Sequence, residues 1–472
     1  MVMKKLSVLA MAMIVMASCA KENVQPNENN DQANILEIGL TSTKTALGEE
    51  IKEGNKSFFP IVWSEGDEIA VIENMGVAEK QNVLVYKLLK GAGTANGTFE
   101  KVSGGPAPKE IKDVIYPASA VMPNSTLISD IPIVDVSSLV PKDQTQSYEE
   151  GNFDKSAAVM YFHRNNPADK IVLEPLSSII CIPIKGFDDN DVVTAVKWQN
   201  MDGRTATVTL NCPNGVTLSK GQATNFYLSI QPMLKDCKGI AYVYLKNGAI
   251  QVKTPRNLKA FQAGTLHRFP EWTLSKKAKW TIKYIGSERK TSMSNQTPLG
   301  LGQYMIDGND LSWWEFRRNS KGSMAGPHKV IIDLGKTEHI KGLKIKGPET
   351  KITSDYTVKD EFGEKVITVS KGYNAPCTVY ASFLKEGELT EAFKSTFCNT
   401  NSFEKDAQEV HKAEISKGIT YYYGTGMKDY WNINLTKEYD ARYLVIHFYQ
   451  CWNDKETGGA ASKMKVAELD IY

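Results

Sequence analysis

Ile61-Val62-Trp63-Ser64-Glu65-Gly66-Asp67-Glu68-Ile69-Ala70-Val71 contains the pattern that repeats through most of this chain. Two apolar runs flank a Gly-Asp turn, and this order predicts a β-hairpin. Further short runs rich in Val, Ile, Tyr and Phe predict more strands, over residues 83–89, 171–173, 179–184, 241–245, 330–334 and 443–449. Beyond the N-terminus, only residues 386–393 suit a short helix. The fold class is therefore predicted to be all-β.

The length and charge of the chain limit its organisation and its partners. A chain of 472 residues is long enough for about three domains. Its formal net charge is +2 and its basic residues are scattered, so we expect no nucleic-acid partner. Its seven cysteines match neither a disulfide framework nor a zinc pattern, so no particular disulfide is predicted.

The sequence carries no motif of a common catalytic class. It has no nucleophile elbow, phosphate-binding loop, paired-histidine zinc motif or dinucleotide fingerprint, and its six histidines are scattered. A carboxylate pair for glycoside hydrolysis needs no sequence signature, so that activity stays an alternative. We predict that the protein is not an enzyme.

The N-terminus has the pattern of a bacterial export signal. A start with two lysines leads into an apolar stretch over residues 6–16, which is too short to span a membrane. Met16-Ala17-Ser18-Cys19 resembles a lipobox, in which the cysteine sulfur receives a diacylglycerol and the preceding residues are removed. We therefore predict a signal peptide over 1–18 and lipidation of Cys19. An ordinary secretory signal with an incidental cysteine is the alternative.

Residues 19–34 are polar and rich in Asn, with almost nothing to bury, which predicts a flexible tether behind the lipidated cysteine. The run Cys19-Ala20-Lys21-Glu22 is similar to the tag that sends lipoproteins of the Bacteroides type to the cell surface. We predict an outer-membrane lipoprotein at the cell surface, anchored by its lipid. Retention at the periplasmic face is the alternative.

Two segments, 35–168 and 169–274, resemble the fimbrillin-like lipoproteins of Bacteroides relatives. The resemblance rests on the lipobox, Lys44-Thr45, Val62-Trp63 followed by Gly66-Asp67, the strand after Pro175, and Ala263-Gly264. It implies two successive transthyretin-like β-sandwiches over residues 35–270, and some members of the family are pilus subunits assembled by strand donation. In the simpler reading, Trp63 and Asp67 only build a core and a turn.

The third segment, 275–472, resembles the discoidin family, also called coagulation-factor type C domains, whose bacterial members include family 32 carbohydrate-binding modules. The motifs follow in the family's order: Trp280-Thr-Ile-Lys-Tyr, Ile306-Asp307-Gly308-Asn309, His328 to Gly335, Ala441 to Ile446, and Val466 to Tyr472. The resemblance implies a jelly-roll β-sandwich whose first and last strands lie close together.

The resemblance to the discoidin family also implies a calcium site. In that family the Asp-Gly-Asn loop and a late glutamate often meet around a calcium ion, which prefers six to eight oxygen ligands. Asp307, Asn309 and Glu468 occupy these positions, and calcium would have a structural role there. In the alternative reading, Asp307 only forms a turn and Glu468 lies on the surface.

Tryptophans are concentrated in residues 275–472, where exposed indoles could stack on the apolar face of a sugar. The candidate ligand-binding residues are Trp431, Trp452, Trp314, Arg317 and His328. The family motif buries one tryptophan after its Asp-Gly turn, so either Trp313 or Trp314 belongs to the core. Trp280 is also expected in the core, and a core role stays open for every single tryptophan.

These features together predict a glycan-binding adhesin of the cell surface, which presents a discoidin-like module on a fimbrillin-like stalk. Its partner would be a glycan on host tissue or mucus, or a dietary polysaccharide. The first alternative is a fimbrial subunit, at a pilus tip or within the pilus, that assembles with other pilus subunits by strand donation and binds protein. The second alternative is an accessory lipoprotein of a polysaccharide-uptake system.

Overall fold

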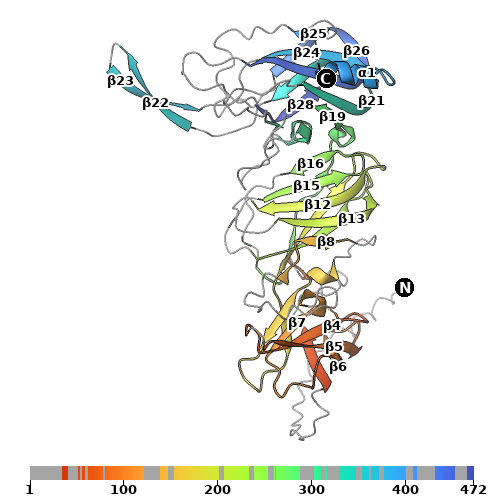
Figure 1. Cartoon of the computed structure of the whole chain (residues 1–472), viewed down its shortest axis with the longest axis vertical. Helices are drawn as coiled ribbons and strands as arrows, with labels where there is room; N and C mark the ends of the chain where they lie inside the picture. The colour runs from red at the N-terminus through yellow and green to blue at the C-terminus, as the bar shows by residue number, and fades with distance from the viewer. Residues whose placement is uncertain are drawn as a thin grey trace, which may run out of the picture.

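The described residues of the computed structural model are almost entirely β-structure, which confirms the predicted all-β class (Figure 1). Described are residues 34–40, 51–53, 56–58, 62–77, 80–121, 139–146, 154–200, 207–232, 236, 239–253, 260, 262–286, 302–309, 312, 314–315, 329–346, 353–360, 363–370, 377–399, 408–411, 431–451 and 465–472. Within these ranges the single α-helix is α1 (Glu391–Asn399). The helix predicted over 386–393 therefore begins later, after a turn at 386–388.

The first unit is a barrel whose strands close on themselves by hydrogen bonding. Around it run β1 (Ile35–Leu40), β10 (Val172–Pro175), β9 (Met160–His163), β7 (Asp113–Tyr116), β4 (Glu68–Glu73), β5 (Asn82–Lys90) and β6 (Asn96–Ser103). Strands β4, β5 and β7 are apolar on both faces, because a second cluster with Val121 and Val140 covers the side opposite the main core. A small hairpin, β2 (Ile51–Glu53) with β3 (Lys56–Phe58), is separate from the barrel.

The hairpin predicted around Gly66 is wrong in its pairing. Strand β4 pairs with β5 and β7, whereas Trp63 makes an isolated bridge with Ala92. The indole of Trp63 is buried against Phe99 and Tyr116, with ring centroids 4.7 and 5.5 Å away. Trp63 therefore has the core role that the simpler reading gave it.

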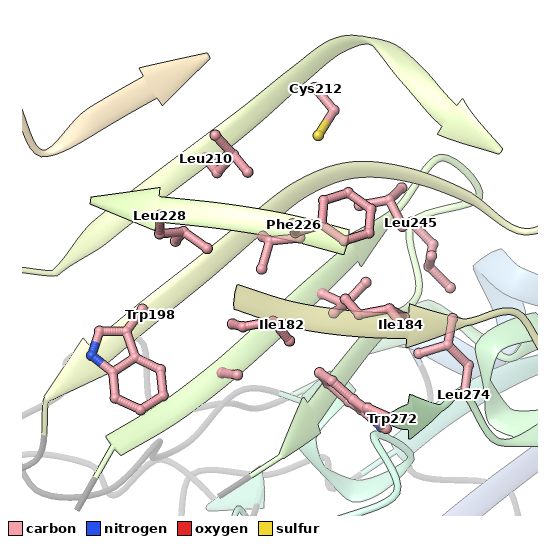
Figure 2. Packing of buried hydrophobic residues seen from close by; sticks show 14 of the residues in the cluster. Ile182, Ile184, Trp198, Leu210, Cys212, Phe226, Leu228, Leu245, Trp272 and Leu274 are labelled. Atoms are coloured by element: carbon pink, nitrogen blue, oxygen red, sulfur yellow. The ribbon is translucent and has the colours of Figure 1, made fainter. Parts of the chain in front are cut away.

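The second unit is a sandwich of two sheets. One sheet contains β14 (Thr224–Ile230), β11 (Ser178–Lys185), β17 (Leu266–Arg268) and β18 (Trp272–Thr273). The other follows the order β16 (Ile250–Lys253), β15 (Gly239–Leu245), β12 (Val192–Asn200), β13 (Val208–Thr217) and β8 (Asp143–Thr145). Figure 2 shows their shared core, where Ile182 and Phe226 of one sheet meet Trp198 and Leu210 of the other.

The first two units exchange strands across the predicted boundary between residues 168 and 169. Strand β10 follows that boundary but closes the barrel, and β8 precedes it but pairs with β13. The amide of Gln144 on β8 donates to the carbonyl oxygen of Ser229 at 2.7 Å. Cys181 and Tyr227 of the second unit belong to the core of the first, whereas their neighbours Ile180, Ile182 and Phe226 belong to the core of the second.

The third unit is built on a six-stranded sheet. It contains β19 (Thr281–Ile285), β21 (Lys329–Lys346), β26 (Trp431–Cys451), β24 (Cys377–Leu384), β25 (Gln408–His411) and β28 (Glu468–Ile471). Two further pairs accompany it, β20 (Trp314–Glu315) with β27 (Lys465–Val466) and β22 (Thr353–Asp360) with β23 (Gly363–Ser370). The first strand, β19, pairs with residues 330–333 at one end of β21, and the last strand, β28, pairs with residues 343–346 at its other end.

Candidate functional site

The predicted ligands of the calcium ion lie where the second and third units meet. A 3-10 turn in the linker, η6 (Lys276–Lys279), begins after Ser275, whose hydroxyl accepts a hydrogen bond from the Lys277 N–H. A second 3-10 turn, η7 (Gly302–Met305), leads directly into Asp307. Strand β28 carries Glu468. Elements from both ends of the third unit thus converge on one site.

Asp307 organises its own loop. It is 1% exposed, and its carboxylate accepts a hydrogen bond from the Asn309 N–H at 2.8 Å and one from the Ser312 hydroxyl at 2.5 Å. The turn passes through Gly308 at a φ of 82°, a conformation that residues with a Cβ rarely adopt. Both carboxylate oxygens of Asp307 are therefore used inside the loop.

Glu468 is buried rather than on the surface, and a lysine neutralises it. Its side chain is 3% exposed, and its Oε1 atom is buried without a hydrogen-bond partner among the described residues. The Lys277 ammonium, itself 5% exposed, forms an ion pair with Glu468 Oε2. The same ammonium lies 4.0 Å from Asp470 Oδ2 and 5.7 Å from the ring centroid of Trp280.

Burial dominates the electrostatics of this site. It raises the pKa of the Asp307 carboxyl well above its ordinary value, and the nearby Glu468 raises it further. Burial also raises the pKa of Glu468 to about 7, although the Lys277 ammonium opposes that shift. Two carboxyl groups with little access to water therefore share one nearby cation.

The predicted calcium ligands come together, but the donor set does not fit a calcium ion. Calcium needs six to eight oxygens. Both Asp307 oxygens already accept hydrogen bonds, and Glu468 Oε2 faces the Lys277 ammonium, which would repel a divalent cation. Within the described part of the chain no group of three or more His, Cys, Asp or Glu side chains could hold a metal ion. Bound calcium thus remains a prediction, and the arrangement of charges argues against it.

A cavity of about 380 Å³ lies beside this ion pair, lined by Ser275, Lys276, Lys277, Gly308, Asn309, Glu468 and Asp470. A second cavity, of about 470 Å³, lies between the second unit and the third. Its walls hold the ion pairs of Lys279 with Asp191 at 2.5 Å and of Arg442 with Asp333 at 3.1 Å. The charges around both cavities are largely paired within the protein.

The structure places only part of the predicted sugar-binding set. The prediction that Trp314 contacts a ligand is wrong, because its side chain is 0% exposed in the core of the third unit, together with Trp280. Trp431 begins β26 opposite Ile345, and its side chain lies outside the described residues. Trp452, Arg317 and His328 lie entirely outside them.

Sequence reasoning missed Lys277. The run Ser275-Lys276-Lys277-Ala278-Lys279 has the composition of a solvated linker, and nothing local shows which lysine is buried. The Ser275 cap before the lysines is a usable sign of a short turn. The partner of Lys277 lies on the last strand, so only the tertiary structure reveals the pair.

Comparison with known proteins gives a limited result. No protein-family model matches the chain, and no curated protein matches it. Solved structures that match include family 32 carbohydrate-binding modules. One, from Clostridium perfringens NanJ in complex with galactose, is 16% identical, with a TM-score of 0.24, and the match covers 42% of this chain and 95% of that one.

Two further modules from Clostridium perfringens match in the same way. CpGH89CBM32-5, in complex with GalNAc-β-1,3-galactose, is 12% identical over 42% of this chain and 97% of that one, with a TM-score of 0.24. CBM32-1 from a family 31 glycoside hydrolase is 15% identical over 41% of this chain and 93% of that one, with a TM-score of 0.22. Likeness at this level carries no argument about a site.

Among the described residues, no helix is long and apolar enough to cross a membrane.

Proposed function

We propose that this protein is a non-catalytic, glycan-binding lipoprotein of the cell surface. The lipid on Cys19 anchors it to the outer membrane, the first two units form a stalk, and the third unit binds the glycan. In Figure 1 the third unit lies at the opposite end of the molecule from the first, an arrangement that suits display away from an anchor.

One observation carries this proposal. Gly308 and Asn309 of the Asp307 loop line one cavity with Glu468 of the last strand, and Lys277, which precedes the first strand, forms an ion pair with Glu468. These are the relations that the resemblance to the discoidin family implies for residues 275–472. They support a discoidin-like module, and sugar recognition in this chain is inferred from that class of module.

The recognition mechanism is stacking without turnover. The C–H face of a sugar packs on an indole while its hydroxyl groups bond to polar neighbours. Trp431 and Trp452 lie in polar sequence and are the candidates for the stacking surface. A single shallow site binds weakly, so display of many copies on one cell would supply avidity.

A glycan array probed with the lipid-free mature chain tests the proposal. We expect selective binding that falls roughly tenfold in Trp431→Ala or Trp452→Ala while circular dichroism stays unchanged. Phe187→Ala is the matched control, because Phe187 is an exposed aromatic residue of the second unit. Absence of binding to every glycan by the folded chain would refute the proposal.

A second candidate function, a pilus subunit, is favoured by the position of β1. This N-terminal strand pairs with β6 on one side and β10 on the other, and Leu36 and Ile38 are buried in the barrel. Removing it would leave two open strand edges that a strand from another subunit could fill. Proteolytic trimming through Leu40 followed by size-exclusion chromatography tests this function. Polymers would favour the pilus subunit, and monomers would count against it.

A further inference from the structure

We propose that the Lys277 ammonium is a built-in cation that takes the position assigned to calcium, and that it fastens the third unit to the linker without a metal. The inference does not depend on glycan binding. The resemblance implies oxygen ligands around a calcium ion, whereas the structure places a lysine ammonium against one of those ligands, Glu468.

The two buried carboxyl groups of this site need a compensating positive charge. Asp307 and Glu468 are both buried, and Glu468 lines one cavity with Gly308 and Asn309, the two residues that follow Asp307. Two neighbouring buried carboxyl groups are costly unless a positive charge or hydrogen bonds compensate them. Lys277 supplies such a charge from within the chain, and its own burial shows that the ammonium lies inside the site.

The lysine that supplies this charge comes from the linker between the second and third units. Lys277 belongs to η6 in the linker, and its neighbours on the same turn point to different units. Lys276 pairs with Asp470 on β28 at 3.2 Å. Lys279 pairs with Asp188 and Asp191 of the second unit, at 2.9 and 2.5 Å. One short turn therefore holds the last strand of the third unit and a loop of the second.

The Asp307 loop also contacts the second unit. The N–H of Val252 on β16 donates to the carbonyl oxygen of Asp307 at 3.3 Å. Tyr304, which precedes the loop, packs in one apolar cluster with Ile240 and Tyr242 of β15. The Lys277–Glu468 ion pair thus lies where the second and third units contact each other. A fixed cation at this position would hold these two units together.

Thermal unfolding of the mature chain in calcium and in chelator tests the inference. We expect the wild-type Tm to be the same in millimolar Ca²⁺ and in EDTA, with no saturable heat when Ca²⁺ is titrated in. Lys277→Met should lower the Tm of the third unit by roughly 5–15 °C, because it leaves a buried carboxylate unpaired. Lys276→Met, the neighbouring control, removes a half-exposed ammonium and should lower it by less than about 3 °C.

Either of two results would overturn the inference. One is a wild-type Tm that rises with Ca²⁺, or saturable binding of Ca²⁺ in calorimetry. The other is a Lys277→Met protein as stable as Lys276→Met. If Lys277→Met fails to fold, the titration of the wild-type chain decides alone. Neither result bears on whether the third unit binds a glycan, so the two proposals fail separately.

Discussion

At the residue scale, single polar side chains determine how the loops of this protein close. Asp67 accepts a hydrogen bond from the Ser64 N–H at 2.7 Å and another from the Tyr116 hydroxyl at 3.2 Å, so it ties a turn to the barrel wall. Asp307 closes its own loop in the third unit by accepting hydrogen bonds from Asn309 and Ser312. A turn-forming Asp is visible in the sequence, but its distant partner is not.

Asp67→Ala should therefore destabilise the first unit. The substitution leaves a buried hydroxyl and a backbone N–H without their acceptor, which costs about 1–3 kcal/mol. Urea unfolding of the mature chain measures the loss. Glu65→Ala, an exposed change in the same turn, should stay within about 0.5 kcal/mol of wild type. Equal unfolding midpoints for the two variants would show that Asp67 does not hold the turn.

His339 should titrate above its ordinary pKa of 6.5. Hydrogen bonds from its ring nitrogens to Asp440 and Glu438, both at 2.7 Å, favour the charged imidazolium and raise the pKa. The small stabilisation from this pair is complete below pH 6.5 and disappears as the pH rises through the raised pKa. An NMR titration of the histidine ring protons measures it.

Two comparisons control that titration. Asp440→Asn should bring the pKa of His339 down toward 6.5. His267, whose pKa is lowered by burial, should titrate below 6.5 in the same spectra. A His339 pKa at or below that of His267 would contradict the assignment.

At the element scale, the sequence predicted most of the structure that arises from local pattern. Alternating and continuous apolar runs located strands such as β11 and β21. The closure of the barrel and the exchange of β8 and β10 were not predictable, because strand pairing depends on contacts between distant residues. The predicted calcium ligands meet, but their cation comes from an unsuspected linker.

Lys279→Met should loosen the joint between the second and third units. Lys279 neutralises Asp191, whose side chain is 1% exposed, so its loss should cost about 1–3 kcal/mol. Limited trypsin digestion should cut the linker around residues 275–286 faster than in wild type. Lys283→Met, which removes a more exposed lysine nearby, is the control. Equal cleavage rates in the two variants would mean that Lys279 does not secure the joint.

At the scale of the whole molecule, three β-rich units follow one another, and each junction is tied differently (Figure 1). The first and second units exchange strands, and residues of the second unit pack in the core of the first. The second and third units are joined by the charged turn η6 and a small apolar cluster. This construction suits a stalk that presents a terminal module, which is the function that we propose.

The most direct test compares the mature chain with a version that ends at residue 274, on one glycan array. We expect that the mature chain binds a defined set of glycans and that the shortened chain, although folded, binds none of them. Equal binding by both chains would place the site on the stalk. Absence of binding by the folded mature chain would contradict glycan recognition altogether.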